Sequence, residues 1–411
     1  MKKSAQLVVS MLALMAAVLA CVLPGAGGAP TSAPNEVETI VAATLQALTP
    51  APGTEATSTP EPEASAVLPR PLYFLNNDGI GNTQVFRLAR DGVTLTQVTA
   101  ETAAVKAYDV SPVDGSVAFV VNNQLVWVNA DGSGRRVLAD GGPVDPNNQF
   151  ATSMSNPVFS PDGQTVAYGM NGVNLIAIAS GASNLVLPTN PGDIAFGQPP
   201  EMYLPRAYSP DGTKLVVTVA IPNSDGISSG IYNIASATLT RLSGGDGARL
   251  CCSAQAWTSD SASLYVGIPF LGMFSSGLWR ADAATGDLTT LLPTEAGGGN
   301  YNLADYPYLA PDGQLYFFFA SLPAPDGFID NAPLQIVRAA PDGVTGRTVL
   351  RPETFGVLNE ALWAPDASAV VTAMAPGPSV YEGGALQLYF TDGTKSMVPL
   401  APFGKQLRWG P

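Results

Sequence analysis

The chain has 411 residues and a net charge of −14, although only 13% of its residues are charged. This acidity does not favour contact with phosphate backbones, so we expect no nucleic-acid partner. The chain contains no histidine, which excludes Ser-His-Asp and Cys-His catalysis and histidine-ligated zinc. We therefore expect that the chain is not an enzyme and has no metal site or cofactor. Carboxylate and lysine chemistry stay open.

Residues 1–21 have the pattern of an export signal. Lys2 and Lys3 precede an apolar segment, which ends at Leu19-Ala20-Cys21. This resembles a bacterial lipoprotein signal peptide, whose lipobox cysteine, here Cys21, receives lipid. Cleavage further along the chain and an uncleaved anchor are the alternatives. Each places the rest of the chain outside the cytoplasm. With lipid on Cys21, the chain would be anchored to a membrane in the cell envelope or periplasm, and the pattern leaves open which membrane carries the anchor.

Residues 22–69 are predicted to be a linker rich in Pro, Thr and Ala. Apolar residues at helical spacing favour a short helix over 36–48, which Asn35 would cap. Residues 49–69 bury too little apolar surface to fold, so we expect an extended spacer.

From residue 70 onward a turn motif repeats every 48 to 54 residues, the main internal signal in the chain. In its full form it reads Ser-Pro-Asp-Gly: proline fixes one φ angle, aspartate bonds to its own backbone and glycine accepts a positive φ. The aspartates of the six copies are Asp114, Asp162, Asp211, Asp260, Asp312 and Asp366.

Each turn lies between the first and second strands of a repeat, and a third and a fourth strand follow the second. Val117–Val120 exemplifies the second strand, Gln124–Val128 the third and Leu288–Leu291 the fourth. Each repeat is therefore predicted to be a four-stranded antiparallel sheet. Such a sheet has two apolar faces, and radial stacking buries both, which gives an all-β fold, a β-propeller. A straight array is the alternative, but it would need polar end caps.

The two ends of the repeat region complement each other. The first unit begins with a second strand, Leu72–Leu75, whereas the last residues, Gln406–Trp409, form a lone inner strand. We therefore expect the C-terminal strand to close the ring with the first blade. Counting second strands predicts seven blades, with six or eight as alternatives.

The Ser-Pro-Asp-Gly turns over residues 70–411 resemble the propeller repeats of the TolB family, which also occur in prolyl oligopeptidase and tricorn protease propellers. The resemblance implies the fold. It implies no peptidase activity, because the hydrolase domain with its G-x-S-x-G motif is missing. TolB itself is a periplasmic scaffold with an extra N-terminal domain, so its particular partners do not transfer.

Long connections are predicted on one face only, including residues 140–156, 188–205, 293–305, 320–333 and 375–385. Binding usually uses such elaborated loops, so we expect the functional surface on this long-loop face. Aromatic side chains there suit contact with a protein or a carbohydrate. The candidates are Tyr203, Phe270, Phe274, Tyr301, Phe328 and Tyr381.

Two features outside the repeated turns could also carry chemistry. Cys251 and Cys252 are adjacent and extracytoplasmic, so a vicinal disulfide is predicted, with free thiols or an intermolecular bridge as alternatives. The Asp-rich segments 76–82 and 223–226 could ligate calcium, but an Asx turn is favoured.

Two functions follow from these patterns. The leading hypothesis is a non-catalytic, monomeric scaffold that binds envelope proteins or peptides through its long-loop face. The alternative is binding of carbohydrate or wall polymer, with or without carboxylate-dependent glycosidase or lyase activity.

Overall fold

The computed structural model describes residues 66–193, 195, 197–222, 227–245, 250, 254–272 and 274–411. The regular structure in these ranges is β-strand, apart from α3 (Gln149–Thr152). None of the helical structure in them is long and apolar enough to cross a bilayer. The predicted signal peptide with Cys21, the helix 36–48 and the segment 223–226 lie outside the described residues, as do Cys251 and Cys252.

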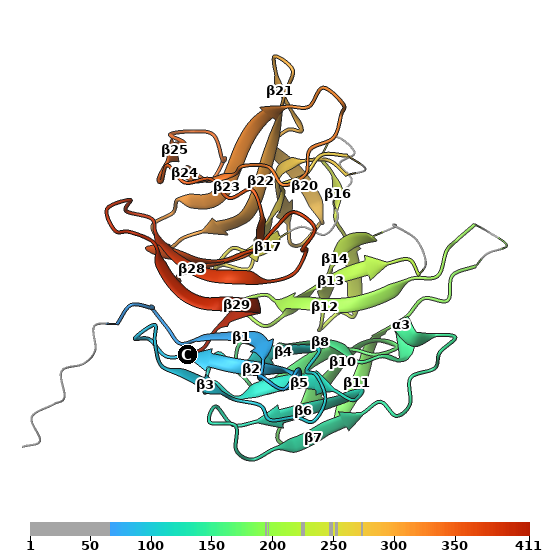
Figure 1. Ribbon diagram of the computed structural model, residues 1–411. Helices are drawn as coiled ribbons and strands as arrows, with labels where there is room; N and C mark the ends of the chain where they lie inside the picture. Colours follow the sequence, from blue (N-terminus) through green and yellow to red (C-terminus); the bar gives the residue numbers. More distant parts are fainter. Residues whose placement is uncertain are drawn as a thin grey trace, which may run out of the picture. The chain divides into compact units, whose positions relative to one another are not determined.

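The strands of the described residues form six sheets: three of four strands, two of five and one of seven (Figure 1). In the four-stranded sheets consecutive strands pair antiparallel, as the sequence repeat predicts. Their strands are β4 (Ala107–Val110), β5 (Val117–Val121), β6 (Gln124–Val128), β7 (Arg136–Asp140); β8 (Ser155–Phe159), β9 (Thr165–Gly169), β10 (Gly172–Ala177), β11 (Ser183–Pro188); and β12 (Met202–Tyr208), β13 (Lys214–Ala220), β14 (Ile227–Asn233), β15 (Thr238–Arg241).

The two five-stranded sheets are the same meander with one short strand added. In one sheet β16 joins β20 in parallel, and in the other β21 pairs with the beginning of β22. Their strands are β16 (Ser243–Gly244), β17 (Ala254–Trp257), β18 (Ser263–Ile268), β19 (Gly277–Asp282), β20 (Asp287–Leu292); and β21 (Glu295–Gly297), β22 (Asn300–Leu309), β23 (Leu315–Pro323), β24 (Gln335–Ala339), β25 (Thr348–Val349).

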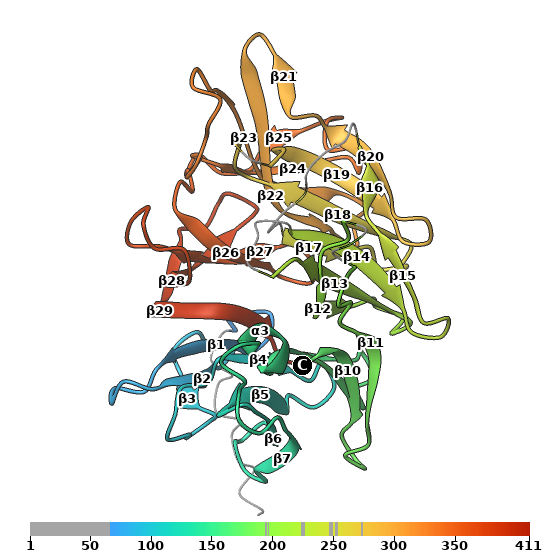
Figure 2. The same ribbon diagram turned by 90° about the vertical axis from the view of Figure 1, so that its right-hand side faces the viewer.

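The seven-stranded sheet joins the two ends of the repeat region. The last strand, β29, pairs with β28 through residues such as Val398 and with β1 through Arg408 and Trp409. Both views show β29 beside β1 (Figures 1 and 2). Its strands are β26 (Leu358–Trp363), β27 (Ala369–Met374), β28 (Gly384–Phe390), β29 (Val398–Trp409), β1 (Leu72–Asn77), β2 (Thr83–Leu88) and β3 (Leu95–Gln97).

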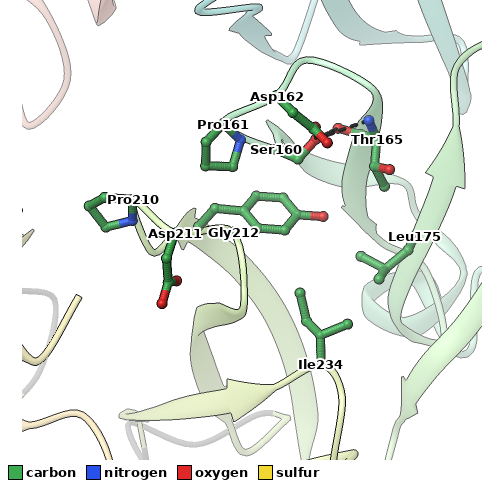
Figure 3. A pocket seen from close by; sticks show the side chains of 10 residues that line it. Ser160, Pro161, Asp162, Thr165, Leu175, Pro210, Asp211, Gly212 and Ile234 are labelled. Atoms are coloured by element: carbon green, nitrogen blue, oxygen red, sulfur yellow. Dashed lines mark hydrogen bonds between the residues drawn. The ribbon is translucent and has the colours of Figure 1, made fainter. Parts of the chain in front are cut away.

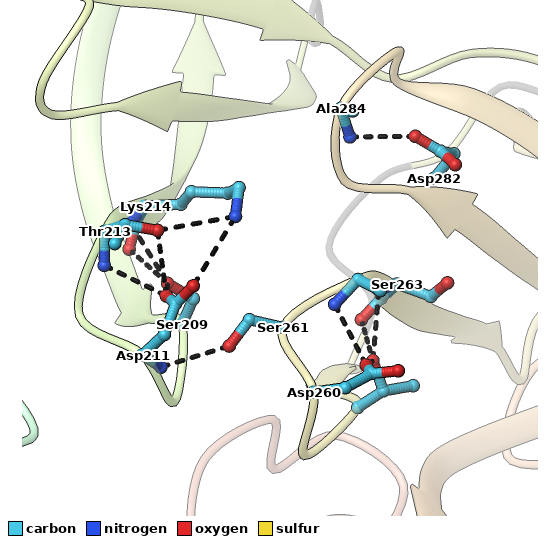
Figure 4. A network of polar contacts seen from close by, with 11 residues as sticks. Ser209, Asp211, Thr213, Lys214, Asp260, Ser261, Ser263, Asp282 and Ala284 are labelled. Atoms are coloured by element: carbon cyan, nitrogen blue, oxygen red, sulfur yellow. Dashed lines mark hydrogen bonds and ion pairs between the residues drawn. The ribbon is translucent and has the colours of Figure 1, made fainter.

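The repeated turns have the hydrogen bonds that their sequence predicts. The Ser160 hydroxyl donates to Asp162 Oδ1 at 2.6 Å, and the Thr165 N–H donates to the Ser160 hydroxyl at 3.0 Å. The turn at Ser209 repeats this arrangement (Figure 4). Gly163, with φ at 68°, needs the left-handed conformation that glycine adopts without a Cβ clash.

Apolar side chains from successive sheets pack face to face. Tyr73 and Leu75 of β1 share one buried cluster with Tyr108 and Phe119 of the next sheet. Fully burying a side chain of this kind stabilises the fold by about 1.5–3 kcal/mol. The described sheets are therefore held together by their faces, as a propeller requires.

The loop predictions are wrong where strands extend into them, most of all at residues 293–305. The predicted loop 293–305 contains β21 and the first half of β22, because β22 and β23 form a hairpin longer than the others. Asp305 therefore lies in a strand.

Candidate functional site

The six predicted aromatics do not share one environment. Tyr203 is only 6% exposed: it pairs with Val219 inside the sheet, and its hydroxyl donates to the Glu201 carboxylate at 2.8 Å. The predicted exposure of Tyr203 is therefore wrong, because β12 begins earlier than the loop prediction allowed. Tyr301 lies on β22 and is half-buried.

The other four aromatics lie near one another. The loops that carry Phe270 and Phe328 are joined by an isolated bridge, in which Leu271 and Ile329 exchange two backbone hydrogen bonds of 2.9 and 3.0 Å. The rings of Phe270 and Phe274 meet edge to face at 6.1 Å. Phe328 and Tyr381 are 65% and 75% exposed.

A cavity of about 320 Å³ lies among these loops and the strands β22 and β26. We call it the Asp305 pocket. Its walls combine aromatic rings, side-chain amides and two carboxyl groups. The residues that supply these groups are Phe270, Asp305, Tyr306, Asp330, Asn331, Phe355, Asn359 and Tyr381.

Asp305 reaches this pocket from an irregular part of an inner strand. The pairing of β22 with β23 shifts register between Asp305 and Tyr308, and Tyr306 has a positive φ of 45°. Such β-bulges re-aim side chains, often next to active sites. Asp305 is 6% exposed, and among the described residues its carboxyl accepts one hydrogen bond, from the Tyr306 N–H at 2.9 Å. Burial raises the pKa of Asp305 to about 8, so it holds a proton at neutral pH.

Asn359 links Tyr306, which lines the pocket, to the loop that carries Tyr381. Its backbone oxygen accepts a hydrogen bond from the Tyr306 hydroxyl at 2.6 Å. Its side-chain amide donates to the backbone oxygens of Val380 at 3.0 Å and Gly383 at 2.7 Å. Asn359 therefore positions the loop that carries Tyr381.

Further charged side chains of the inner strands hold the C-terminal strand. Arg408 Nε donates to Asp109 Oδ1 at 2.9 Å, and the Glu360 carboxylate accepts the N–H groups of Gln406 at 2.7 Å and Leu407 at 2.9 Å. Burial raises the pKa of Asp109, and Arg408 offsets part of this effect. These carboxylates are thus committed to neighbouring strands.

Sequence reasoning missed Asp305, Asp330 and Asn359. The available signal was an acidic or amide residue inside the mostly apolar segment before a repeated turn, as in Leu303-Ala304-Asp305 and Leu358-Asn359-Glu360. Asp330 carried no such signal, because it lies on a loop.

A second cavity, of about 520 Å³, lies on the short-turn side between the turns at Asp162 and Asp211 (Figure 3). The next pair of turns differs, since the Ser261 hydroxyl there accepts the Asp211 N–H at 3.0 Å (Figure 4). The position that corresponds to Ser261 in the earlier turn is Gly212, which has no side chain to bridge the turns. Both aspartates of this cavity are engaged by their own turns.

The segment 76–82 forms an Asx turn. Asp78 Oδ1 accepts the N–H groups of Ile80 and Asn82, each at 3.0 Å. This is the favoured alternative to a calcium loop.

No protein-family model and no curated protein matches the chain. Among solved structures, TolB from Acinetobacter baumannii matches with 13% identity and a TM-score of 0.43, over 80% of this chain and 79% of that one. A structure from a study of two prolyl endopeptidases matches with 13% identity and a TM-score of 0.52, over 82% of this chain and 49% of that one. An oligogalacturonate lyase in complex with manganese matches with 12% identity and a TM-score of 0.50, over 80% of this chain and 84% of that one.

The fold is a β-propeller, in line with the matches whose TM-scores are 0.50 and 0.52. At these identities the similarity concerns the fold alone. The manganese is said of that lyase alone. Among the residues that the structure of this chain describes, no three histidine, cysteine or acidic side chains come together as a metal site would require.

The comparisons overturn the expectation that the chain is not an enzyme. Structures with this fold include an oligogalacturonate lyase and a prolyl endopeptidase. A propeller fold therefore does not exclude enzymatic activity. The missing histidine excludes imidazole chemistry only. The buried carboxyl of Asp305 shows where acid chemistry has a suitable group.

Proposed function

We propose that this chain is a lipid-tethered, extracytoplasmic propeller of seven blades whose long-loop face binds carbohydrate chains in the Asp305 pocket. The proposed blade count rests on seven inner strands: β4, β8, β12, β17, β22, β26 and the end of β29. Closure of the ring is supported by the pairing of β29 with β1 and by the hydrogen bond of 2.7 Å from the Tyr108 hydroxyl of β4 to the Gln406 oxygen of β29.

The observation that carries the proposed ligand is the composition of the pocket. The rings of Phe270 and Tyr381 offer flat apolar faces, against which the C–H groups of a sugar ring can pack. Carboxyl and amide groups beside them can exchange hydrogen bonds with hydroxyl groups. The cavity volume of about 320 Å³ falls in the range of small-ligand sites.

Glycan binding by the purified chain tests this proposal. Phe270→Ala and Tyr381→Ala should each weaken the binding of oligosaccharides at least tenfold in calorimetric titrations, as expected when an aromatic contact is removed. Phe150→Ala is the matched control, because Phe150 is 55% exposed but does not line this pocket. Equal losses in all three variants would contradict the proposed site.

A second candidate function is capture of an envelope protein or peptide, and the exposure of Phe328 favours it. Phe328 is 65% exposed and lies beside the pocket without lining it. Exposed aromatics of this kind serve as anchors in protein interfaces. Crosslinking in intact cells would separate the two functions: Phe328→Ala should reduce protein capture and leave glycan binding unchanged.

The proposed tether has its own test. Cys21→Ser should release the chain from the membrane fraction and abolish incorporation of a labelled fatty acid. Retention of the label in this variant would rule out lipidation at Cys21.

A further inference from the structure

Two carboxyl groups with opposite surroundings line the Asp305 pocket. Asp305 comes from the inner strand β22 and is 6% exposed, whereas Asp330 comes from the loop between β23 and β24 and is exposed. Pairs of carboxyl groups with unlike environments divide the roles of acid and base in many hydrolytic sites.

We infer that the Asp305 pocket hydrolyses glycosidic bonds, with Asp305 as the general acid and Asp330 as the general base. This inference rests on the proposed carbohydrate binding and adds a reaction to it. It needs no metal, histidine or cofactor.

Asp305 has the properties of a proton donor. Its burial keeps the carboxyl protonated, with a pKa raised to about 8. The Tyr306 N–H is hydrogen-bonded to Oδ1, and no described residue is hydrogen-bonded to Oδ2. The proton can therefore be carried on the oxygen that is free to approach a ligand.

Asp330 has the properties of a positioned base. It follows Ile329, which is fixed by two backbone hydrogen bonds to Leu271. Its Oδ1 accepts the Asn331 N–H at 2.9 Å, a contact within the same loop. Because Asp330 is exposed, water can reach it.

The reaction balances with water as the only co-reactant. The bond between the anomeric carbon and the glycosidic oxygen breaks, and that oxygen takes the proton of Asp305. Water gives one proton to Asp330, and its oxygen bonds to the anomeric carbon. The products are an alcohol and a hemiacetal, and the proton on Asp330 returns to Asp305 through solvent.

The test uses the purified full chain with oligosaccharides from chitin, cellulose, xylan, pectin and peptidoglycan, in water enriched in heavy oxygen. We expect new reducing ends that carry heavy oxygen from at least one of these. Asp305→Asn and Asp330→Asn should each lower the rate by about 100-fold or more, as loss of general acid or base catalysis does. The dissociation constant should stay within about twofold, because both substitutions preserve shape.

Asp326→Asn is the matched control. Asp326 is exposed on the same loop as Asp330 but does not line the pocket, so its rate should equal that of the unchanged chain. The rate should also fall as pH rises through about 8, where Asp305 loses its proton. The other ionisable groups around this site are Tyr306, Asp330, Tyr381 and, on β26, Glu360.

The outcomes separate the two proposals. Binding without new reducing ends, products without heavy oxygen, or full rates in both variants would overturn the hydrolysis and leave carbohydrate binding standing. Absence of binding to every oligosaccharide would overturn both.

Discussion

In the repeated turn at Asp211, the carboxyl accepts hydrogen bonds from the Ser209 hydroxyl and from the backbone and side chain of Thr213. Partial burial alone would raise the pKa of Asp211, but these bonds lower it to about 2. In the Asp305 pocket, near-complete burial and a single hydrogen bond leave the pKa at about 8. At neutral pH the same residue type is thus charged in one region and a proton donor in the other, because the burial of the carboxyl and the number of hydrogen-bond donors around it differ.

The two regions also differ in what they hold in place. In the turn at Ser160, the Ser160 hydroxyl bonds to groups at most five residues away. The inner strands use charged groups to hold partners that are distant in the chain, such as Asp109 with Arg408. We therefore expect changes in the inner strands to affect stability more than changes in the turns.

Removal of residues 406–411 should have the largest effect. It takes away Arg408 and Trp409, which pair with β1, together with the contacts of Glu360 and Tyr108 to that strand. We expect loss of cooperative thermal unfolding, measured by circular dichroism. A truncated chain that melts at the temperature of the full-length chain would contradict ring closure by this strand.

Asp305→Asn should stabilise the chain at high pH. A raised folded-state pKa makes the stability of the unchanged chain fall as pH rises from about 4, the unfolded value, through about 8. A tenfold difference in proton affinity between the folded and unfolded chain corresponds to about 1.4 kcal/mol. Relative to the unchanged chain, the free energy of unfolding of the variant should therefore be several kcal/mol higher at pH 9 and little changed at pH 4. Urea unfolding at both values measures the difference, and equal gains would refute the raised pKa.

Asp109→Ala should destabilise the chain by about 3 kcal/mol, since it leaves Arg408 and the Phe159 N–H without their acceptor. The double variant Asp109→Ala with Arg408→Met should recover part of the loss in a double-mutant cycle. No recovery would mean that the pair does not hold β29.

Asp211→Asn should have the smallest effect. The Asp211 side chain is 43% exposed, so solvent screening reduces the value of its charge, and we expect a loss of about 1 kcal/mol or less at pH 7. Because its folded pKa is lowered, this contribution is present above about pH 4 and disappears as pH falls through about 2. A loss of equal size at pH 2 and pH 7, measured by urea unfolding, would show that charge is not involved.

The repeat made most of the fold predictable. Turn chemistry at Ser160 and Ser209 and apolar strands such as Gln124–Val128 depend on neighbours in the sequence, and the described sheets contain them. The long hairpin of β22 and β23 was missed, because its extra length depends on pairing between two segments that each look like loops.

The candidate site was predictable only in part. Phe270 and Tyr381 were expected on the long-loop face and line the Asp305 pocket, whereas Tyr203 was expected there and lies in the core. Aromatic residues serve equally well in a core and at a surface, so composition alone does not separate them.

The sequence by itself determined the repeated turns, the strand order and the chemistry that the absence of histidine excludes, because each depends on residue type and local spacing. Only the tertiary structure decided that Asp305, Asp330 and Asn359 meet, since they come from two strands and a loop. It also decided that Asp305 holds a proton, because a carboxyl group loses its charge through what surrounds it in space.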